Sequence, residues 1–185
     1  IKLKNMNKFE AYKMDGLGND FIIFDNRKKS ISLTKDQIIK ISNRNNIGCD
    51  QVIFINKEES GNNLLKFYNS DGSEISACGN GSRCVSYFLM KENKSKKISL
   101  KTKAGILKAK LNNNNLVSIN IGQPNFNWEK IPLIKEMDNK NLKIKINNMN
   151  NEEIIGGFSL SVGNPHVIFF VDSLEKFDLK KIGPL

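Results

Sequence analysis

The stretch Ser76–Cys84 reads SACGNGSRC, and the apolar run VSYFLM follows it directly. The preceding residues, Asn69–Glu74 (NSDGSE), have a composition typical of turns. Downstream, apolar side chains recur at helical spacing on one face at Val85, Phe88 and Leu89. The pattern predicts a helix from about Cys78 to about Lys91, with a cysteine at its N-terminus.

A cysteine at this place could take part in chemistry. Unpaired backbone N–H groups and the helix macrodipole favour an anion at a helix N-terminus, and the same field lowers the pKa of a thiol. Gly79 and Gly81 would let a ligand approach the backbone, and Asn80 adds an amide. The motif therefore suits a thiol beside a bound carboxylate. Taken alone, it is equally compatible with a structural cysteine in a glycine-rich turn.

Two other interpretations of the motif are disfavoured. A phosphate-binding loop would need a Lys-Ser/Thr pair, which CGNGSRC lacks. A disulfide between Cys78 and Cys84 would have to span six positions, or about 9 Å along a helix, which is too far for an S–S bond.

Short apolar runs predict strands over much of the chain. Thr34 and Gln37 have capping-box spacing and predict a second helix over 34–42, and the asparagines at 112–115 predict a hairpin loop. The predicted strands cover 9–14, 21–25, 51–56, 64–69, 97–103, 105–111, 116–121, 156–164 and 166–172.

The composition of the sequence changes near Gln123, because all four prolines lie after it, and this change predicts a domain boundary there. The segments on the two sides of this boundary contain a possible internal repeat, because GLGNDFIIFD (16–25) is similar to SVGNPHVIFFVD (161–172). A chance similarity of two turn-then-strand units is an alternative. If the repeat is real, the chain contains two related halves. Cys78 lies 59 positions after Asn19, and the same step from Asn164 places a counterpart of Cys78 near position 223.

Composition narrows the class of protein. With 185 residues and 39% hydrophobic content the chain can form a core. The net charge of +10 comes from scattered lysines and arginines, so a nucleic-acid-binding module is a minor alternative. The three cysteines argue against a disulfide framework, and no transmembrane run or signal peptide is apparent. We expect a cytosolic or organelle-stromal protein, and the initial Ile1 suggests a fragment.

Four blocks together resemble the diaminopimelate epimerase family. They are YKMDGLGNDFIIFD (12–25), GCDQVIFI (48–55), YNSDGSEISACGNGSRCVSYFL (68–89) and LSVGNPHVIFFVD (160–172), in the family's order. The resemblance implies an α/β (α+β) fold of two similar domains, each a curved sheet wrapped around a central helix. We expect an N-terminal extension over 1–7, a first domain over 8–122 and a partial second domain over 123–185.

The implied function is the epimerisation of LL-diaminopimelate to meso-diaminopimelate, in lysine and peptidoglycan precursor biosynthesis, with no cofactor and no metal. Two cysteines on opposite faces of the substrate exchange the α-proton. A homodimer is compatible with the resemblance, and nucleic-acid or membrane partners are not implied. The residues that match the family's site are Cys78 and His166 as catalytic groups, and Asn19, Gln51, Asn69, Gly79, Asn80 and Asn164 as substrate-binding groups.

This sequence departs from the family pattern in three places. Asp15 stands where a histidine is frequent, and Cys49 precedes Asp50-Gln51 where an apolar residue is usual. In a strand Cys49 would share a face with Gln51. Cys84 is not a departure, because it fits a cysteine that recurs on this helix in the family, and we interpret it as a packing residue. The family's second catalytic cysteine has no match, so we expect this chain alone to be inactive. Another epimerase or racemase of the same superfamily is the alternative.

Overall fold

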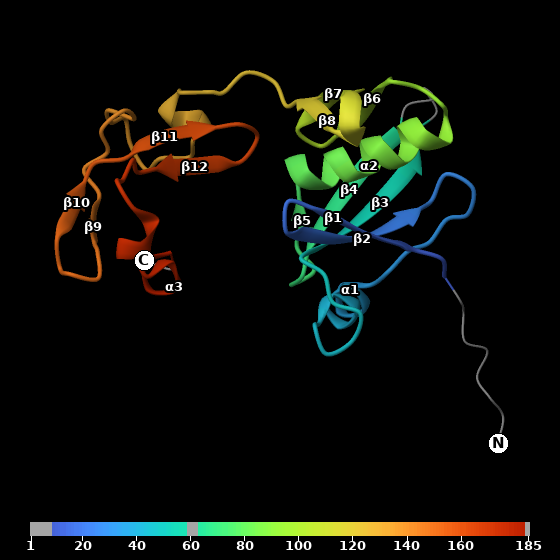
Figure 1. The fold of residues 1–185 in the computed structure, drawn as a ribbon, viewed down its shortest axis with the longest axis horizontal. Helices are drawn as coiled ribbons and strands as arrows, with labels where there is room; N and C mark the ends of the chain where they lie inside the picture. Colours follow the sequence, from blue (N-terminus) through green and yellow to red (C-terminus); the bar gives the residue numbers. More distant parts are fainter. Residues whose placement is uncertain (1–8, 59–62, 184–185) are drawn as a thin grey trace. The chain divides into compact units, whose positions relative to one another are not determined.

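The computed structural model describes residues 9–58 and 63–183 of the chain (Figure 1). The chain divides into two compact units, residues 1–121 and 122–185. The expected N-terminal extension over 1–7 lies outside the described residues.

The first unit is built on one mixed sheet with the strand order β1-β2-β3-β4-β6-β7-β8, in which β5 pairs with β4. β2–β3 and β4–β6 are parallel pairs, and the other pairs are antiparallel. Every strand predicted before residue 122 is present, although the first begins at Tyr12 and not at Phe9. The strands are β1 (Tyr12–Gly16), β2 (Asn19–Asp25), β3 (Gln51–Lys57), β4 (Asn63–Asn69), β5 (Glu74–Ile75), β6 (Lys97–Thr102), β7 (Gly105–Leu111) and β8 (Val117–Asn120).

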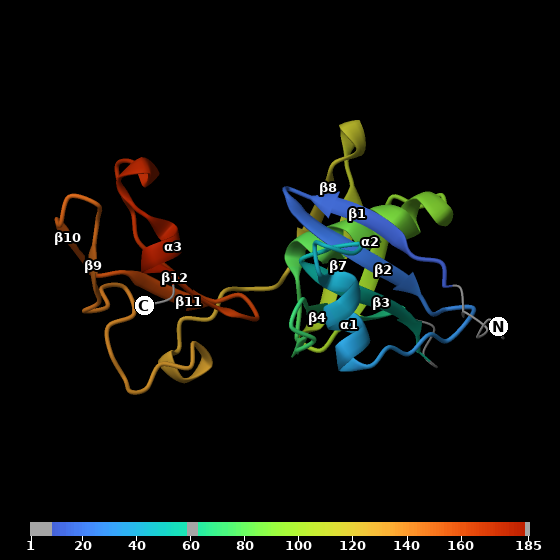
Figure 2. The same ribbon diagram turned by 90° about the horizontal axis from the view of Figure 1, so that it is seen from below.

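The sheet curls around the helix α2 (Gly79–Glu92), as Figures 1 and 2 show. The helix contacts both edge strands, β1 and β8, as well as β2, β6 and β7. Val85 and Leu89 are fully buried in the core between helix and sheet, and Phe88 packs at its margin. The predicted helix and its apolar face are therefore confirmed, and the first unit has the curved sheet around a helix that the family resemblance implies.

The opposite face of the sheet is covered by α1 (Lys35–Ser42), which lies in the crossover between the parallel strands β2 and β3. The predicted capping box is present: the Thr34 backbone N–H donates to Gln37 Oε1 over 2.8 Å, and the Gln37 N–H donates to Thr34 Oγ1 over 3.3 Å. Since β2 and β3 are covered on both faces, they read as continuous apolar runs and not as alternating ones.

Two tight hairpins shape the first unit. Leu17 and Gly18, with φ of 62° and 78°, connect β1 to β2 as in a type I′ turn, and the Gly18 N–H donates to Asp15 Oδ1 over 3.2 Å. This turn makes Asn19 the first residue of β2. The predicted asparagine loop is also confirmed, since the 3₁₀ turn Asn113–Asn115 connects β7 to β8.

The second unit contains small elements within its described residues. Two antiparallel pairs, β9 (Lys145–Asn147) with β10 (Glu153–Ile155) and β11 (Phe158–Ser161) with β12 (Pro165–Ile168), accompany the short helix α3 (Leu179–Ile182). The strand predicted over 166–172 ends at Ile168, because its partner β11 has four residues and the pairing is exhausted there. Across both units, none of the described helices combines the length and apolarity needed to cross a membrane.

Candidate functional site

Cys78 is the N-cap residue of α2. Its backbone is extended, its carbonyl accepts the first helical hydrogen bond from the Ser82 N–H over 2.9 Å, and its Sγ accepts from the Gly81 N–H over 3.4 Å. The side chain is half-buried. The thiol therefore lies where the sequence predicted it, at the N-terminus of a fourteen-residue helix.

The two glycines after Cys78 have different roles. A Cβ on Gly81 would lie 2.7 Å from Ile53 Cδ1 and 3.3 Å from the rings of Phe21 and Phe67, so this glycine lets the helix touch the sheet. The expectation that Gly81 admits a ligand is therefore wrong, because the sheet occupies that space. A Cβ on Gly79 would meet nothing within 4 Å, and the backbone there is open.

Burial dominates the titration of the Cys78 thiol. Desolvation raises its pKa, and the opposing effects of the Gly81 and Asn80 backbone N–H groups and of the Arg83 charge are smaller. The expectation that the helix N-terminus makes a thiolate available near neutral pH is therefore wrong for the resting protein. The helix terminus acts in the predicted direction, but removing the thiol from water outweighs it.

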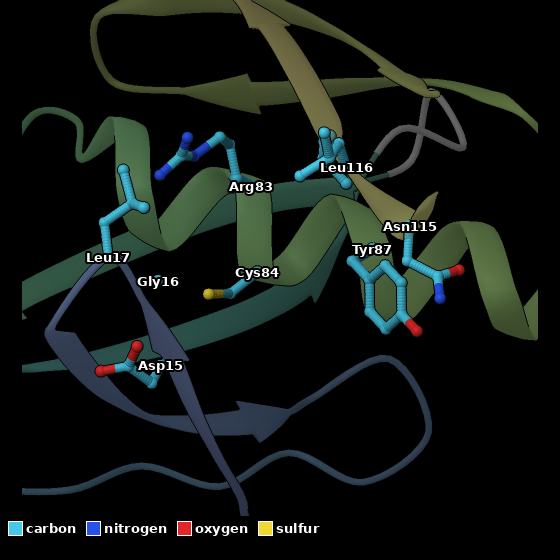
Figure 3. A pocket seen from close by; sticks show the side chains of 9 residues that line it. Asp15, Gly16, Leu17, Arg83, Cys84, Tyr87, Asn115 and Leu116 are labelled. Carbon is cyan, nitrogen blue, oxygen red and sulfur yellow. The ribbon is translucent and has the colours of Figure 1, made fainter. Parts of the chain in front are cut away.

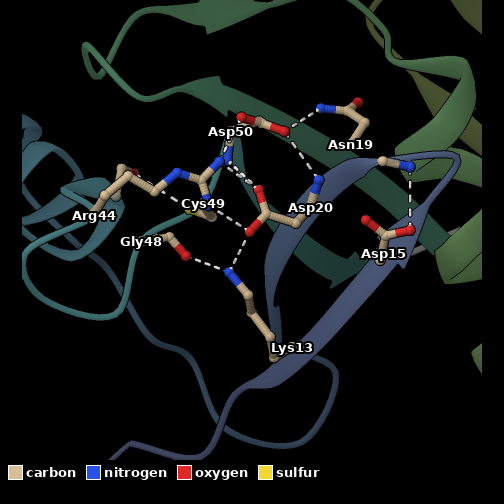
Figure 4. Close-up of polar contacts among 10 residues, drawn as sticks. Lys13, Asp15, Asn19, Asp20, Arg44, Gly48, Cys49 and Asp50 are labelled. Atoms are coloured by element: carbon tan, nitrogen blue, oxygen red, sulfur yellow. Dashed lines mark hydrogen bonds and ion pairs between the residues drawn. The ribbon is translucent and has the colours of Figure 1, made fainter.

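Asn19 lies against this thiol, with 3.8 Å between Cys78 Sγ and Asn19 Oδ1. On its other side, Asn19 Nδ2 donates to Asp50 Oδ2 over 2.9 Å, and the Asp20 backbone N–H donates to the same oxygen over 3.0 Å (Figure 4). The Asn19 amide thus lies between the Asp50 carboxylate and the Cys78 thiol and contacts both. Asp50 directly precedes β3, which pairs in parallel with β2.

Asp50 belongs to a charged cluster that also contains Asp20, Arg44 and Lys13 (Figure 4). Arg44 donates to both oxygens of Asp20, over 2.6 and 2.8 Å, and to Asp50 Oδ1 over 2.7 Å. Lys13 donates to Asp20 Oδ2 over 2.7 Å and also to the Gly48 carbonyl. The Arg44 guanidinium, helped by Lys13, holds the pKa of Asp20 well below its usual range. Asp20 therefore stays ionised at all ordinary pH values.

Gln51 and Asn69 face each other across β3 and β4. Gln51 Nε2 donates to Asn69 Oδ1 over 3.1 Å, and Asn69 Nδ2 donates to Ser73 Oγ over 3.3 Å. The Ser73 hydroxyl in turn donates to Asp71 Oδ1 over 2.6 Å. Gln51 Oε1 is buried and has no hydrogen-bond donor among the residues that the structure describes.

Six of the eight expected site residues gather at one end of the first unit. Asn19 and Gln51 begin parallel strands and Asn69 ends the antiparallel neighbour, so all three lie at the same end of the sheet. The N-terminus of α2, with Cys78, Gly79 and Asn80, packs through Gly81 over that end. Asn80 Oδ1 accepts from the Arg83 guanidinium over 2.8 Å.

The other two expected residues, Asn164 and His166, lie in the second unit on the β11–β12 hairpin. Both are exposed within the structure, and His166 Nδ1 lies 3.0 Å from the Asn164 carbonyl oxygen. The hairpin resembles β1–β2 locally, because a glycine of positive φ precedes the asparagine in each case: Gly18 at 78° and Gly163 at 106°.

A family model described as diaminopimelate epimerase matches residues 11–127, which is more than half of the chain. The chain belongs to the diaminopimelate epimerase family. A diaminopimelate epimerase of Pelagibacter ubique (strain HTCC1062) is 55% identical over 175 residues, which cover 95% of this chain and 64% of that protein. One of Acidiphilium cryptum (strain JF-5) is 36% identical and covers 93% of this chain and 61% of that protein. The chain thus spans less than two thirds of the length of these relatives.

Solved structures share the fold at low sequence identity. A protein described as a predicted epimerase from Pseudomonas aeruginosa matches with a TM-score of 0.59 and 12% identity, over 95% of this chain and 67% of that one. A hydroxyproline epimerase from Agrobacterium vitis matches with a TM-score of 0.52 and 13% identity, over 94% of this chain and 52% of that one. These likenesses establish a diaminopimelate epimerase-like fold.

The other two cysteines of this epimerase family member are buried on opposite sides of the sheet. Cys84 packs in the α2 core, as interpreted from the sequence, and Gly16 approaches it so closely that a Cβ there would lie 3.0 Å from its Sγ. Cys49 belongs to the core on the α1 side, with its Sγ 3.4 Å from Ser42 Oγ. The expectation that Cys49 shares a face with Gln51 is wrong, because β3 begins only at Gln51, and Gly48, with φ of 75°, turns the chain just before it.

A hollow of about 320 Å³ opens on the Cys84 side of α2, between the β1–β2 turn and the β7–β8 loop (Figure 3). Its lining includes Asp15, Leu17, Arg83 and Tyr87, and contains none of the expected site residues. Over residues 9–58 and 63–183, no group of three or more His, Cys, Asp or Glu side chains could hold a metal ion.

The charged cluster behind Asn19 was missed by reasoning from the sequence. A signal was present, because each aspartate adjoins an expected site amide: Asp20 follows Asn19, and Asp50 precedes Gln51. What the sequence could not supply was their contact, since the two aspartates are 30 positions apart and only the parallel pairing of β2 and β3 brings them together.

Proposed function

We propose that the full-length protein containing this chain is a diaminopimelate epimerase, which interconverts LL- and meso-diaminopimelate without a cofactor. The observation that carries the proposal is the half-buried Cys78 thiol at the N-terminus of α2, in contact with Asn19. It occurs in a chain that is 55% identical to a diaminopimelate epimerase over 95% of its length.

Inversion at a carbon requires a proton acceptor on one face and a proton donor on the other. In the proposed reaction one thiolate takes the α-proton and becomes a thiol, while the electron pair stays on the α-carbon. The thiol on the opposite face then gives its proton to that carbon and becomes a thiolate. Cys78 is one of these groups, and His166 assists the thiols.

The second thiol comes from a part of the protein beyond this chain, because Cys49 and Cys84 are buried in the first unit on either side of its sheet. If the second half repeats the first, the step from Asn19 to Cys78 places its cysteine near position 223. The similar hairpins β1–β2 and β11–β12 support such a repeat. We therefore assign residues 8–122 to a first epimerase domain and 123–185 to part of a second.

The carbanion needs stabilisation, and the helix N-terminus is suited to provide it. Backbone N–H groups of Gly79 and Asn80 at the start of α2 would donate to the carboxylate on the reacting carbon as negative charge develops there. Gly79 leaves this approach open, because a Cβ there would meet nothing within 4 Å.

Amides suit the remainder of the substrate. Diaminopimelate carries two ammonium and two carboxylate groups, so both donors and acceptors are needed to bind it. Asn19, Gln51, Asn69 and Asn164 supply them. The buried Oε1 of Gln51, which accepts no hydrogen bond from the residues that the structure describes, is an acceptor suited to an ammonium group. A cytoplasmic location and a homodimer fit this role, whereas nucleic acid and membranes have no part in it.

Incubating the full-length protein with LL-diaminopimelate, and separating the stereoisomers by chiral chromatography, tests the proposal. We expect conversion to an LL/meso mixture without added cofactor. L-Proline and trans-4-hydroxy-L-proline, assayed side by side, should remain unchanged. Epimerisation of either of these with no turnover of diaminopimelate would assign the protein to another reaction of the superfamily.

A further inference from the structure

We propose that Asp50 is a positioning residue that holds the side-chain amide of Asn19 with its carbonyl oxygen toward the Cys78 thiol. Asp50 itself does not touch the thiol. It acts through Asn19, whose Nδ2 lies 2.9 Å from Asp50 Oδ2 (Figure 4). The Oδ1 of the same amide lies 3.8 Å from Cys78 Sγ.

The orientation of the Asn19 amide follows from the chemistry of its neighbour. An ionised carboxylate only accepts hydrogen bonds, whereas an amide has one accepting and one donating end. The end of Asn19 that faces Asp50 must therefore be the NH₂ group, which leaves the carbonyl oxygen for the thiol. Asp50 Oδ2 accepts from the Asp20 backbone N–H at the same time, so the acceptor position is fixed by the main chain.

Asp50 is held at both its backbone and its side chain. Its N–H donates to the Asp20 carbonyl over 3.0 Å and lies 2.9 Å from Asp20 Oδ1, which ties the start of β3 to the start of β2. Arg44 joins the two carboxylates from outside, but its side chain is 59% exposed, so this link contributes little by itself. The anchor is the parallel strand pair, and Arg44 reinforces it.

The amide orientation has a consequence for the thiol. A carbonyl oxygen accepts from an S–H group but repels a thiolate, so Asn19 favours the protonated form of Cys78. Arg83, farther along α2, acts on the thiol in the opposite sense. Asp50 lies behind Asn19, and Asp15 of the β1–β2 hairpin acts on Cys84 instead. Without Asp50 the amide can turn and present its NH₂ group, which favours the thiolate.

This inference rests on the proposed function only in so far as Cys78 takes part in turnover. The protonation state of the Cys78 thiol can be measured without substrate. In the full-length protein, the rate of Cys78 alkylation by iodoacetamide is followed against pH by mass spectrometry of tryptic peptides. Cleavage after Lys66 and Arg83 places Cys78 in the peptide 67–83, while Cys84 falls in 84–91 and Cys49 in 45–57. The three thiols are therefore read separately.

Asp50→Ala should move the midpoint of the Cys78 profile down by about one pH unit and raise its alkylation rate at pH 7 about tenfold. Asp50→Asn is the matched control, since it removes the charge but keeps an oxygen that the Asp20 N–H and the Asn19 amide can share. Its profile should stay close to that of the wild type. An unchanged profile in Asp50→Ala, or equal shifts in both variants, would overturn the proposal.

Asn19→Ala provides a second route if Asp50→Ala does not fold. Removing the carbonyl oxygen from the thiol should also lower the midpoint, and adding Asp50→Asn to Asn19→Ala should change it no further. An unchanged midpoint in Asn19→Ala would contradict the proposal. Wild-type protein that fails to epimerise diaminopimelate would refute the proposed function, and the alkylation profiles would still decide the role of Asp50.

Discussion

Gly81, in the first turn of α2, lies directly against Ile53 of β3, so that a Cβ added to the glycine would be 2.7 Å from Ile53 Cδ1. This contact lets the helix begin on the sheet surface and not one side-chain layer above it. It also brings Cys78 within 3.8 Å of Asn19 on β2. Gly81, which the sequence suggested as part of a ligand-binding turn, thus allows close packing of α2 on the sheet and thereby sets the distance of the thiol from the sheet.

Replacing Gly81 with alanine should lower the free energy of unfolding by about 1–3 kcal/mol, because the new methyl group must displace Ile53 and the aromatic rings beside it. Urea denaturation of the full-length protein measures the change. Gly79→Ala is the matched control: its Cβ enters open space, so its effect should stay within about 0.5 kcal/mol. Equal losses in the two variants would mean that the contact with Ile53 is not what requires Gly81.

If the full-length protein epimerises diaminopimelate as proposed, Cys78→Ser should abolish most of that turnover and preserve the fold. Serine is a favoured N-cap residue, so its hydroxyl can accept from the Gly81 N–H as the thiol does. It is a much weaker acid than a thiol, and we expect a loss in kcat of at least about 10²-fold. Cys84→Ala, which alters a buried cysteine outside the site, should lose stability but keep its kcat. Activity of Cys78→Ser close to that of the wild type would disprove the catalytic assignment.

Local signals made much of the first unit predictable. The capping box at Thr34 and Gln37, the apolar face of α2 and the asparagine loop each depend on residues within one turn or one hairpin. The position of Cys78 at the N-terminus of α2 was predictable for the same reason. Two features were not: the burial that raises the pKa of Cys78, and the pairing of Asp50 with Asn19. Both depend on residues far apart in sequence, which only the folded sheet brings together.

The pH dependence of Cys78 alkylation should reflect that burial. A raised pKa means that the thiolate, which is the reactive form, appears only at higher pH. In the resting full-length protein, the iodoacetamide profile of Cys78 should therefore have its midpoint above that of a free cysteine peptide. At pH 7 Cys78 should still react faster than Cys84, because it is half-buried whereas Cys84 is 5% exposed. A midpoint below that of the peptide would show that the helix terminus outweighs desolvation after all.

The 185-residue chain by itself should not epimerise diaminopimelate, because it supplies Cys78 without a second thiol for the opposite face. Its other cysteines, Cys49 and Cys84, are buried at 2% and 5% exposure in two different cores. In D₂O, we expect no deuterium at the α-carbon of meso-diaminopimelate incubated with the isolated chain. The full-length protein under the same conditions should incorporate it and serves as the positive control. Incorporation by the isolated chain at a comparable rate would mean that one thiol and solvent suffice, and would remove the need for a partner cysteine.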